Sequence, residues 1–146
     1  MDLIIVTSGV LLHVALGRWI SSPWLVPDLT LVSLVLALRR SRSVEPMRTV
    51  VITSLLAMAF TVHHPFHAAG AYLVVGWGIK TLMSRLWYPP SKGEATRGFL
   101  PLISIGIAEA LLLVIVGTPL VFAVMRWVVT CGCSVPVILL MSRRLA

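Results

Sequence analysis

The stretch PDLTLVSLVLALRR, Pro27 to Arg40, shows how this chain is built. It opens with proline and aspartate, continues as an apolar run and closes with two arginines. Proline suits the first turn of a helix because its missing N–H removes no helical bond, and a carboxylate there meets the positive end of the helix dipole. An apolar helix that ends in arginines is typical of a membrane span with a cytoplasmic exit.

The rest of the chain has the same apolar character. Its 146 residues are 58% hydrophobic and 12% charged, with a mean hydropathy of +0.99. Soluble domains have about 25% charged residues, so these charges are too few to cover a surface that faces water. We therefore predict an all-α integral membrane protein: a single domain, residues 1–146, folded as a compact bundle of about six short transmembrane helices.

Outward from Pro27–Arg40, further apolar segments end at charges, prolines or aromatic clusters. Several are shorter than the roughly 17 to 20 residues that cross a bilayer, so neighbouring helices are expected to shelter them. The last segment contains Arg126 and Pro136, and its membrane part is predicted to begin only at Trp127. The predicted helices span about 3–20, 24–38, 49–62, 66–87, 99–117 and 120–141.

The basic residues orient the bundle. Most lie in loops that share one side of the membrane if the N-terminus is inside, and only Arg18 and Arg126 lie opposite. This bias predicts two cytoplasmic termini in a bacterial inner membrane. The net charge of +7 then reflects contact with anionic lipid and not with nucleic acid, because no binding motif accompanies it. The residues predicted to face lipid headgroups are Arg39, Arg40, Arg42, Arg143 and Arg144.

Aromatic side chains near the segment ends agree with this topology. Tryptophan and tyrosine favour the headgroup layer, where their rings meet both apolar and polar surroundings. Trp77 is the exception, and we expect it inside the bundle. The predicted anchors are Trp19, Trp24, Trp87, Tyr88 and Trp127.

Charged residues inside the apolar segments are the first functional candidates. A charge at the centre of a membrane helix costs about 2.5 to 3.5 kcal/mol, so each needs a partner. Asp28 either begins its helix or contacts a partner or ligand. Glu109 is expected to pair with Lys80 inside the bundle or with a polar group of a partner helix, and proton or substrate handling is the third alternative. Lys80 can also reach the interface with its long side chain.

The segment His63-His64-Pro65-Phe66-His67 is a candidate polar turn, with a metal or pH-sensing site as the alternative. Zinc requires three or four ligands of suitable geometry, and Pro65 interrupts the helix that would align His63 with His67. Cys131 and Cys133 are interpreted as small residues at a helix start or a packing seam. We therefore predict no metal and no cofactor.

Small residues predict close helix packing in the fifth segment. Ser104 with Ala108, and Gly106 with Ala110, have the small-xxx-small spacing that lets helix backbones approach each other. The sequence does not distinguish packing within the chain from packing against a partner. Together with the charged residues, the candidate partner contacts are Asp28, Lys80, Gly106, Glu109 and Ala110.

The sequence contains none of the common catalytic motifs. It has no phosphate-binding P-loop, no H-E-x-x-H and no G-x-S-x-G. No pair of carboxylates is placed for acid-base chemistry. An enzyme is therefore not expected.

The segment Pro27–Arg40 resembles the second-helix signature of the rod-shape-determining MreD family, with its P-D-L opening and A-L-R exit. Pro65 to Ala68 is similar to the family's P-L-G-x turn, and Val135-Pro136 with the basic end resembles its last helix. Met58 to Thr61 departs from the family, which often has an acidic residue and glycines there. The resemblance covers nearly the whole chain.

This resemblance implies a non-enzymatic scaffold of the elongation machinery. Such a protein binds the bitopic protein MreC and links cytoplasmic MreB filaments to the cell-wall synthesis complex. The family is also similar in fold to the substrate-binding subunits of vitamin importers, which supplies one alternative function. A small accessory subunit of another, energy-transducing membrane complex is the other alternative.

Overall fold

The computed structural model describes residues 2–40, 46–61, 65–86 and 94–144. Within these ranges the chain forms six α-helices, one short 3-10 helix and no strand, which confirms the predicted all-α class. Arg42, His63, His64, Trp87 and Tyr88 lie outside the described residues. The helices are α1 (Asp2–Trp19), η1 (Pro23–Leu25), α2 (Leu29–Arg40), α3 (Pro46–Phe60), α4 (Pro65–Leu86), α5 (Glu94–Val116) and α6 (Leu120–Arg144).

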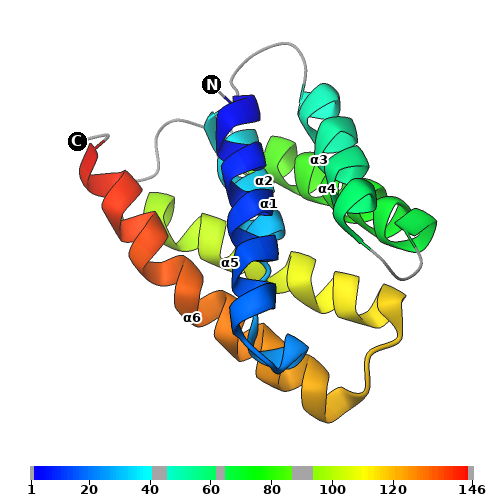
Figure 1. Cartoon of the computed structure of the whole chain (residues 1–146). Coiled ribbons are helices and arrows are strands. Elements are labelled where there is room, and N and C mark those ends of the chain that lie inside the picture. The colour runs from blue at the N-terminus through cyan, green and yellow to red at the C-terminus, as the bar shows by residue number, and fades with distance from the viewer. Residues whose placement is uncertain (1, 41–45, 62–64, 87–93, 145–146) are drawn as a thin grey trace.

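Successive helices pack in pairs. α1 lies against α2, α3 against α4, and α5 against α6 (Figure 1). The starts of α1 and α5 and the end of α6 lie in the upper and left part of the view, whereas the connections after α1 and α5 lie at the bottom (Figure 1). The start of the first helix and the end of the last helix therefore share one end of the bundle.

The central helix is α2, which contacts all five other α-helices. Every residue from Leu31 to Leu38 is buried, and Leu31, Leu34 and Val35 have no exposed surface. A helix that is apolar on all sides has no polar face to turn outward, so neighbours surround it. This is why the stretch Pro27–Arg40 determines the arrangement of the fold.

The outer surface of the bundle is apolar as well. Leu120 and Val114 are 79% and 78% exposed, and large apolar side chains are exposed along α1, α5 and α6. By length and composition, Leu120–Leu140 could cross a membrane, and 17% of its apolar window is buried. It is the one helix in the described part of the chain that meets this test. The other apolar helices are shorter, among them Leu3–Trp19 and Pro101–Val116.

The predicted starts of the second and fifth helices were wrong. The second helix begins at Leu29 and not at residue 24, because residues 23–25 form η1 and Val26 is extended, with φ −83° and ψ 116°. The residue before a proline disfavours the helical conformation, and Pro27 follows Val26. α5 begins at Glu94 and not at residue 99, whereas α6 begins at Leu120 as predicted, so Arg126 lies inside the last helix.

The expectation that Trp77 lies inside the bundle was also wrong. The face of α4 that packs inward contains Ala71, Val75 and Ile79, which are spaced four residues apart and buried. Trp77 lies off this face and is 59% exposed. Trp19, an expected interfacial anchor, is 89% exposed at the end of α1.

Candidate functional site

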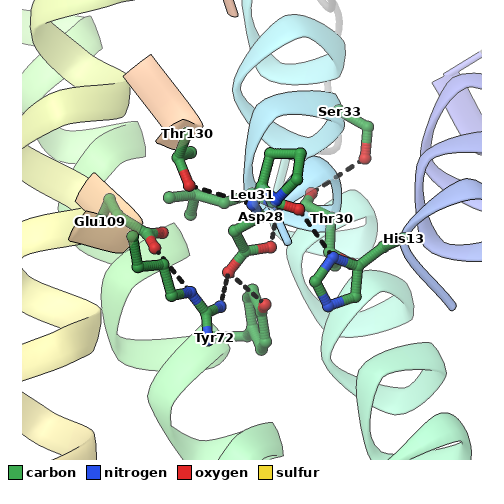
Figure 2. Close-up of polar contacts among 10 residues, drawn as sticks. His13, Asp28, Thr30, Leu31, Ser33, Tyr72, Glu109 and Thr130 are labelled. Carbon is green, nitrogen blue, oxygen red and sulfur yellow. Dashed lines mark hydrogen bonds and ion pairs between the residues drawn. The ribbon is translucent and has the colours of Figure 1, made fainter. Parts of the chain in front are cut away.

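The site is built around Asp28, which begins α2 inside the molecule. The Asp28 carboxylate is fully buried, and its Oδ1 accepts a hydrogen bond from the backbone N–H of Leu31 at 3.0 Å (Figure 2). The Asp28 N–H donates to the Thr130 hydroxyl of α6, also at 3.0 Å. Free N–H groups at a helix start need acceptors, and in the protein interior side chains must supply them. Asp28 and Thr130 fill this role here.

His13 of α1 binds the backbone just before this helix start. Its Nδ1 lies 2.9 Å from the carbonyl oxygen of Pro27 (Figure 2). A carbonyl oxygen only accepts hydrogen bonds, so Nδ1 must be the protonated nitrogen of this contact. In the neutral ring, Nε2 is then left as an acceptor. The extended segment before α2 is thus held from both α1 and α6.

Arg126 of α6 joins two buried carboxylates. Its Nη2 donates to Asp28 Oδ2 and its Nε donates to Glu109 Oε1, both at 3.0 Å. The Tyr72 hydroxyl of α4 donates to the same Asp28 Oδ2 at 2.7 Å (Figure 2). The side chain of Arg126 is 22% exposed, whereas those of Asp28 and Glu109 have no exposed surface. One polar cluster therefore connects α2, α4, α5 and α6.

The cluster contains one more acidic than basic group. Asp28 accepts three hydrogen bonds, but Glu109 Oε2 is buried without a partner that meets hydrogen-bond geometry among the described residues. Thr130 and Cys131 lie near the same carboxyl. Both carboxylate oxygens of Asp28 therefore accept hydrogen bonds, whereas only one of the two Glu109 oxygens does.

The predicted pairing of Glu109 with Lys80 was wrong, because Arg126 is its partner. α5 and α6 form a hairpin, and Glu109 and Arg126 lie at similar distances from the turn between them. Lys80 lies eight residues beyond Tyr72 along α4, which is about 12 Å further along the bundle. Lys80 is therefore excluded as the partner of Glu109 by its position along α4, and not by the chemistry of its side chain.

For Asp28, the two roles that the sequence left open occur together. The carboxylate begins α2 through Leu31 and pairs with Arg126 through its other oxygen. Arg126 lay within the predicted last helix but outside its predicted membrane part, and it was not predicted as the partner of a buried charge. His13, Tyr72 and Thr130 were not recognised as members of the site.

The two small-residue seams of α5 differ in what they contact. Gly106 faces Trp127, whose indole Nε1 donates to the Gly106 carbonyl at 2.8 Å, and a Cβ at Gly106 would lie 3.4 Å from that ring. Ser104 and Ala108 are buried within the chain. Ala110 is exposed. Of the four residues in the two seams, only Ala110 is exposed.

The histidine segment is described only in part. His67 lies in α4, with its Nε2 3.3 Å from the carbonyl oxygen of Ile115. Within the described ranges, no group of three histidine, cysteine or acidic side chains is placed to hold a metal ion. Cys131 and Cys133 are free thiols.

Replacing Tyr72 tests the hydroxyl bond to Asp28. We expect Tyr72→Phe to lower the free energy of unfolding by about 1.5 to 3 kcal/mol, because the lost hydrogen bond ends on a charged acceptor. The measurement is denaturant unfolding in detergent micelles. In an Asp28→Asn background the same substitution should cost clearly less. An equal cost in both backgrounds would show that the bond contributes nothing specific.

Comparison of the chain with family models, with curated proteins and with solved structures finds no match. The geometry of the site is a set of mutual contacts that fix one helix start and four helices relative to one another.

Proposed function

We propose that this chain is a non-enzymatic scaffold subunit in the bacterial inner membrane, where it serves the cell-shape and elongation machinery. The observation that supports this best is how the buried polar groups are used. Asp28, Tyr72 and Arg126 bond to one another and to a helix start, so they hold the bundle together and leave few polar groups for a substrate. A scaffold needs a fixed shape more than it needs reactive groups.

A multi-pass membrane location is supported by the surface and by the backbone. Exposed apolar side chains cover α1, α5 and α6, which is not compatible with a large water-facing surface. The non-helical segment Val26–Asp28 is buried, and its polar groups bond to His13 and Thr130. Irregular backbone is tolerated at membrane depth only where the protein itself satisfies it in this way.

The partner in this proposal is a bitopic, MreC-like protein of the cell-wall synthesis complex. Its single membrane helix would need an apolar surface with small residues, because helices in lipid associate through close packing. On α5, Ile103, Ile107 and Ala110 are exposed and follow one another at helical spacing. The proposal places the partner helix along this face.

Substrate binding as in a vitamin importer receives less support. A cavity of about 200 Å³ lies between the end of α1, the α1–α2 connection and Arg126. Sites for drug-sized ligands usually enclose about 300 to 1,000 Å³. The cavity can hold a small group, but not a typical vitamin.

Photo-cross-linking from the exposed face of α5 tests the scaffold proposal. A photoreactive amino acid at Ile107 should cross-link to a co-expressed MreC-like protein, as identified by mass spectrometry. The matched control is Leu55 on α3, which is 53% exposed, similar to the 45% of Ile107. Leu55 should yield lipid adducts only. Equal yields from both positions, or none from Ile107, would count against the proposed partner surface.

A further inference from the structure

The small cavity beside Arg126 has polar groups that the cluster around Asp28 does not use. His13, Ser21 and Arg126 line it, together with apolar residues such as Ile20 and Pro23. Arg126 is only partly buried, and it is the one charged side chain in the lining. The cavity is therefore a small, partly open hollow beside the buried ion pairs.

Both His13 and Arg126 retain hydrogen-bonding capacity. A guanidinium has five N–H donors, and Arg126 uses Nε and Nη2 on Glu109 and Asp28. In the described part of the chain, no acceptor is bonded to its Nη1. His13 uses Nδ1 on Pro27, which leaves Nε2 as an acceptor that points away from that carbonyl (Figure 2). The cavity thus offers donors from one wall and an acceptor from another.

The charge of the cluster restricts what can bind there. The two carboxylates outnumber the single guanidinium, so a simple anion would be repelled by them and would gain little from Arg126. A ligand that brings an oxygen acceptor together with its own cationic donor avoids this repulsion. A phosphate joined to a primary ammonium has this combination and no net charge.

In the proposed membrane topology, the end of α1 brings this cavity close to the headgroup layer. Gly17 and Ile20 line it at the end of α1, next to Trp19, which is 89% exposed. Tryptophan favours the headgroup layer of a bilayer. A Cβ at Gly17 would meet no atom within 4 Å, so the space beside this residue is open.

We propose that this cavity binds a phosphoethanolamine group, with a phosphate oxygen accepting from Arg126 Nη1 and the ammonium donating to His13 Nε2. The inference rests on the membrane location in the proposed function, and it adds a specific lipid headgroup as the ligand. Free glycerophosphoethanolamine has the same chemistry as the headgroup of phosphatidylethanolamine.

Lipid titration of the purified, delipidated full chain tests the proposal. Binding is measured by native mass spectrometry with phosphatidylethanolamine, phosphatidylcholine and phosphatidylglycerol that have identical acyl chains. We expect phosphatidylethanolamine to bind about tenfold more tightly than phosphatidylcholine, whose quaternary ammonium cannot donate to His13. Phosphatidylglycerol has no ammonium and should also bind more weakly. Equal binding of the ethanolamine and choline lipids would overturn the proposal.

A matched pair of glycine variants tests whether the preference for phosphatidylethanolamine arises at this cavity. Gly17→Leu should fill the cavity and remove the preference for phosphatidylethanolamine. Gly78→Leu makes the same change in α4, where a Cβ would also meet no atom within 4 Å, and should keep the preference. An unchanged preference in Gly17→Leu would overturn the proposed site. The wild-type lipid comparison needs no variant, so it decides the question even if Gly17→Leu does not accumulate.

Competition with free glycerophosphoethanolamine separates the two sources of the ligand. Competition would support recognition of the headgroup alone, whereas a retained lipid preference without competition would support the intact lipid as the ligand. A chain that folds in detergent but shows no preference overturns this inference and leaves the scaffold proposal standing. A chain recovered without detergent in the aqueous fraction would overturn the proposed membrane function itself.

Discussion

Arg126→Leu is expected to lower the free energy of unfolding by about 3 to 5 kcal/mol, because it leaves buried carboxylates without their cation. Asp28 and Glu109 both lose their ion-pair partner, and neither side chain has access to solvent. The loss is large relative to the usual 5 to 15 kcal/mol of total stability. Unfolding in mixed micelles, together with the amount of protein that accumulates in the membrane, measures the effect.

Arg18→Leu is the matched control for this substitution. Arg18 lies exposed in the last turn of α1, so its replacement should change the stability by no more than about 0.5 kcal/mol. Adding Glu109→Gln to Arg126→Leu should recover part of the loss, since one of the two unpaired carboxylates is then gone. If Arg126→Leu were no more destabilising than Arg18→Leu, the polar cluster would not hold the bundle together.

Gly9→Leu should destabilise the protein by about 3 kcal/mol, through overpacking at a close approach of α1 to α2. A Cβ at Gly9 would overlap the side chain of Ser33 and lie 2.9 Å from the carbonyl oxygen of Leu29. Rotation of the Ser33 side chain would move its Oγ but neither its Cβ nor the backbone oxygen of Leu29, so α1 must move away from α2. Thermal unfolding monitored by circular dichroism would report the loss.

Gly70→Leu is the control for the packing effect. Both glycines lie inside helices, so both substitutions gain about 1 kcal/mol of helix propensity. A Cβ at Gly70 meets no atom within 4 Å, and the substitution should be neutral or stabilising. A Gly9 variant as stable as the Gly70 variant would show that α1 and α2 are not as close as the structure places them.

The sequence predicted the class and order of the helices because these depend on local chemistry. An apolar run bounded by prolines and arginines is most stable as a helix that neighbouring helices or lipid cover. Six α-helices are present in the described residues. Asp28 could be recognised as a helix start for the same reason. Its carboxylate accepts the N–H of a residue only three positions away.

The partners of the buried charges could not be read from the sequence. Whether Glu109 meets Lys80 or Arg126 depends on which residues of different helices lie at the same level, and hairpin geometry sets that level. Gly9 was likewise missed, because only the crossing of α1 over Ser33 makes a Cβ impossible there.

The sequence by itself therefore determined that this chain forms apolar helices and where most of them end, since such signals act over a few neighbouring residues. The tertiary structure alone decided that α2 begins in the interior, that Arg126 joins Asp28 to Glu109, and that His13 and Arg126 share a cavity. These contacts join residues up to about a hundred positions apart, such as Asp28 and Thr130. Their free energy appears only when the helices are packed together, so no local pattern encodes them.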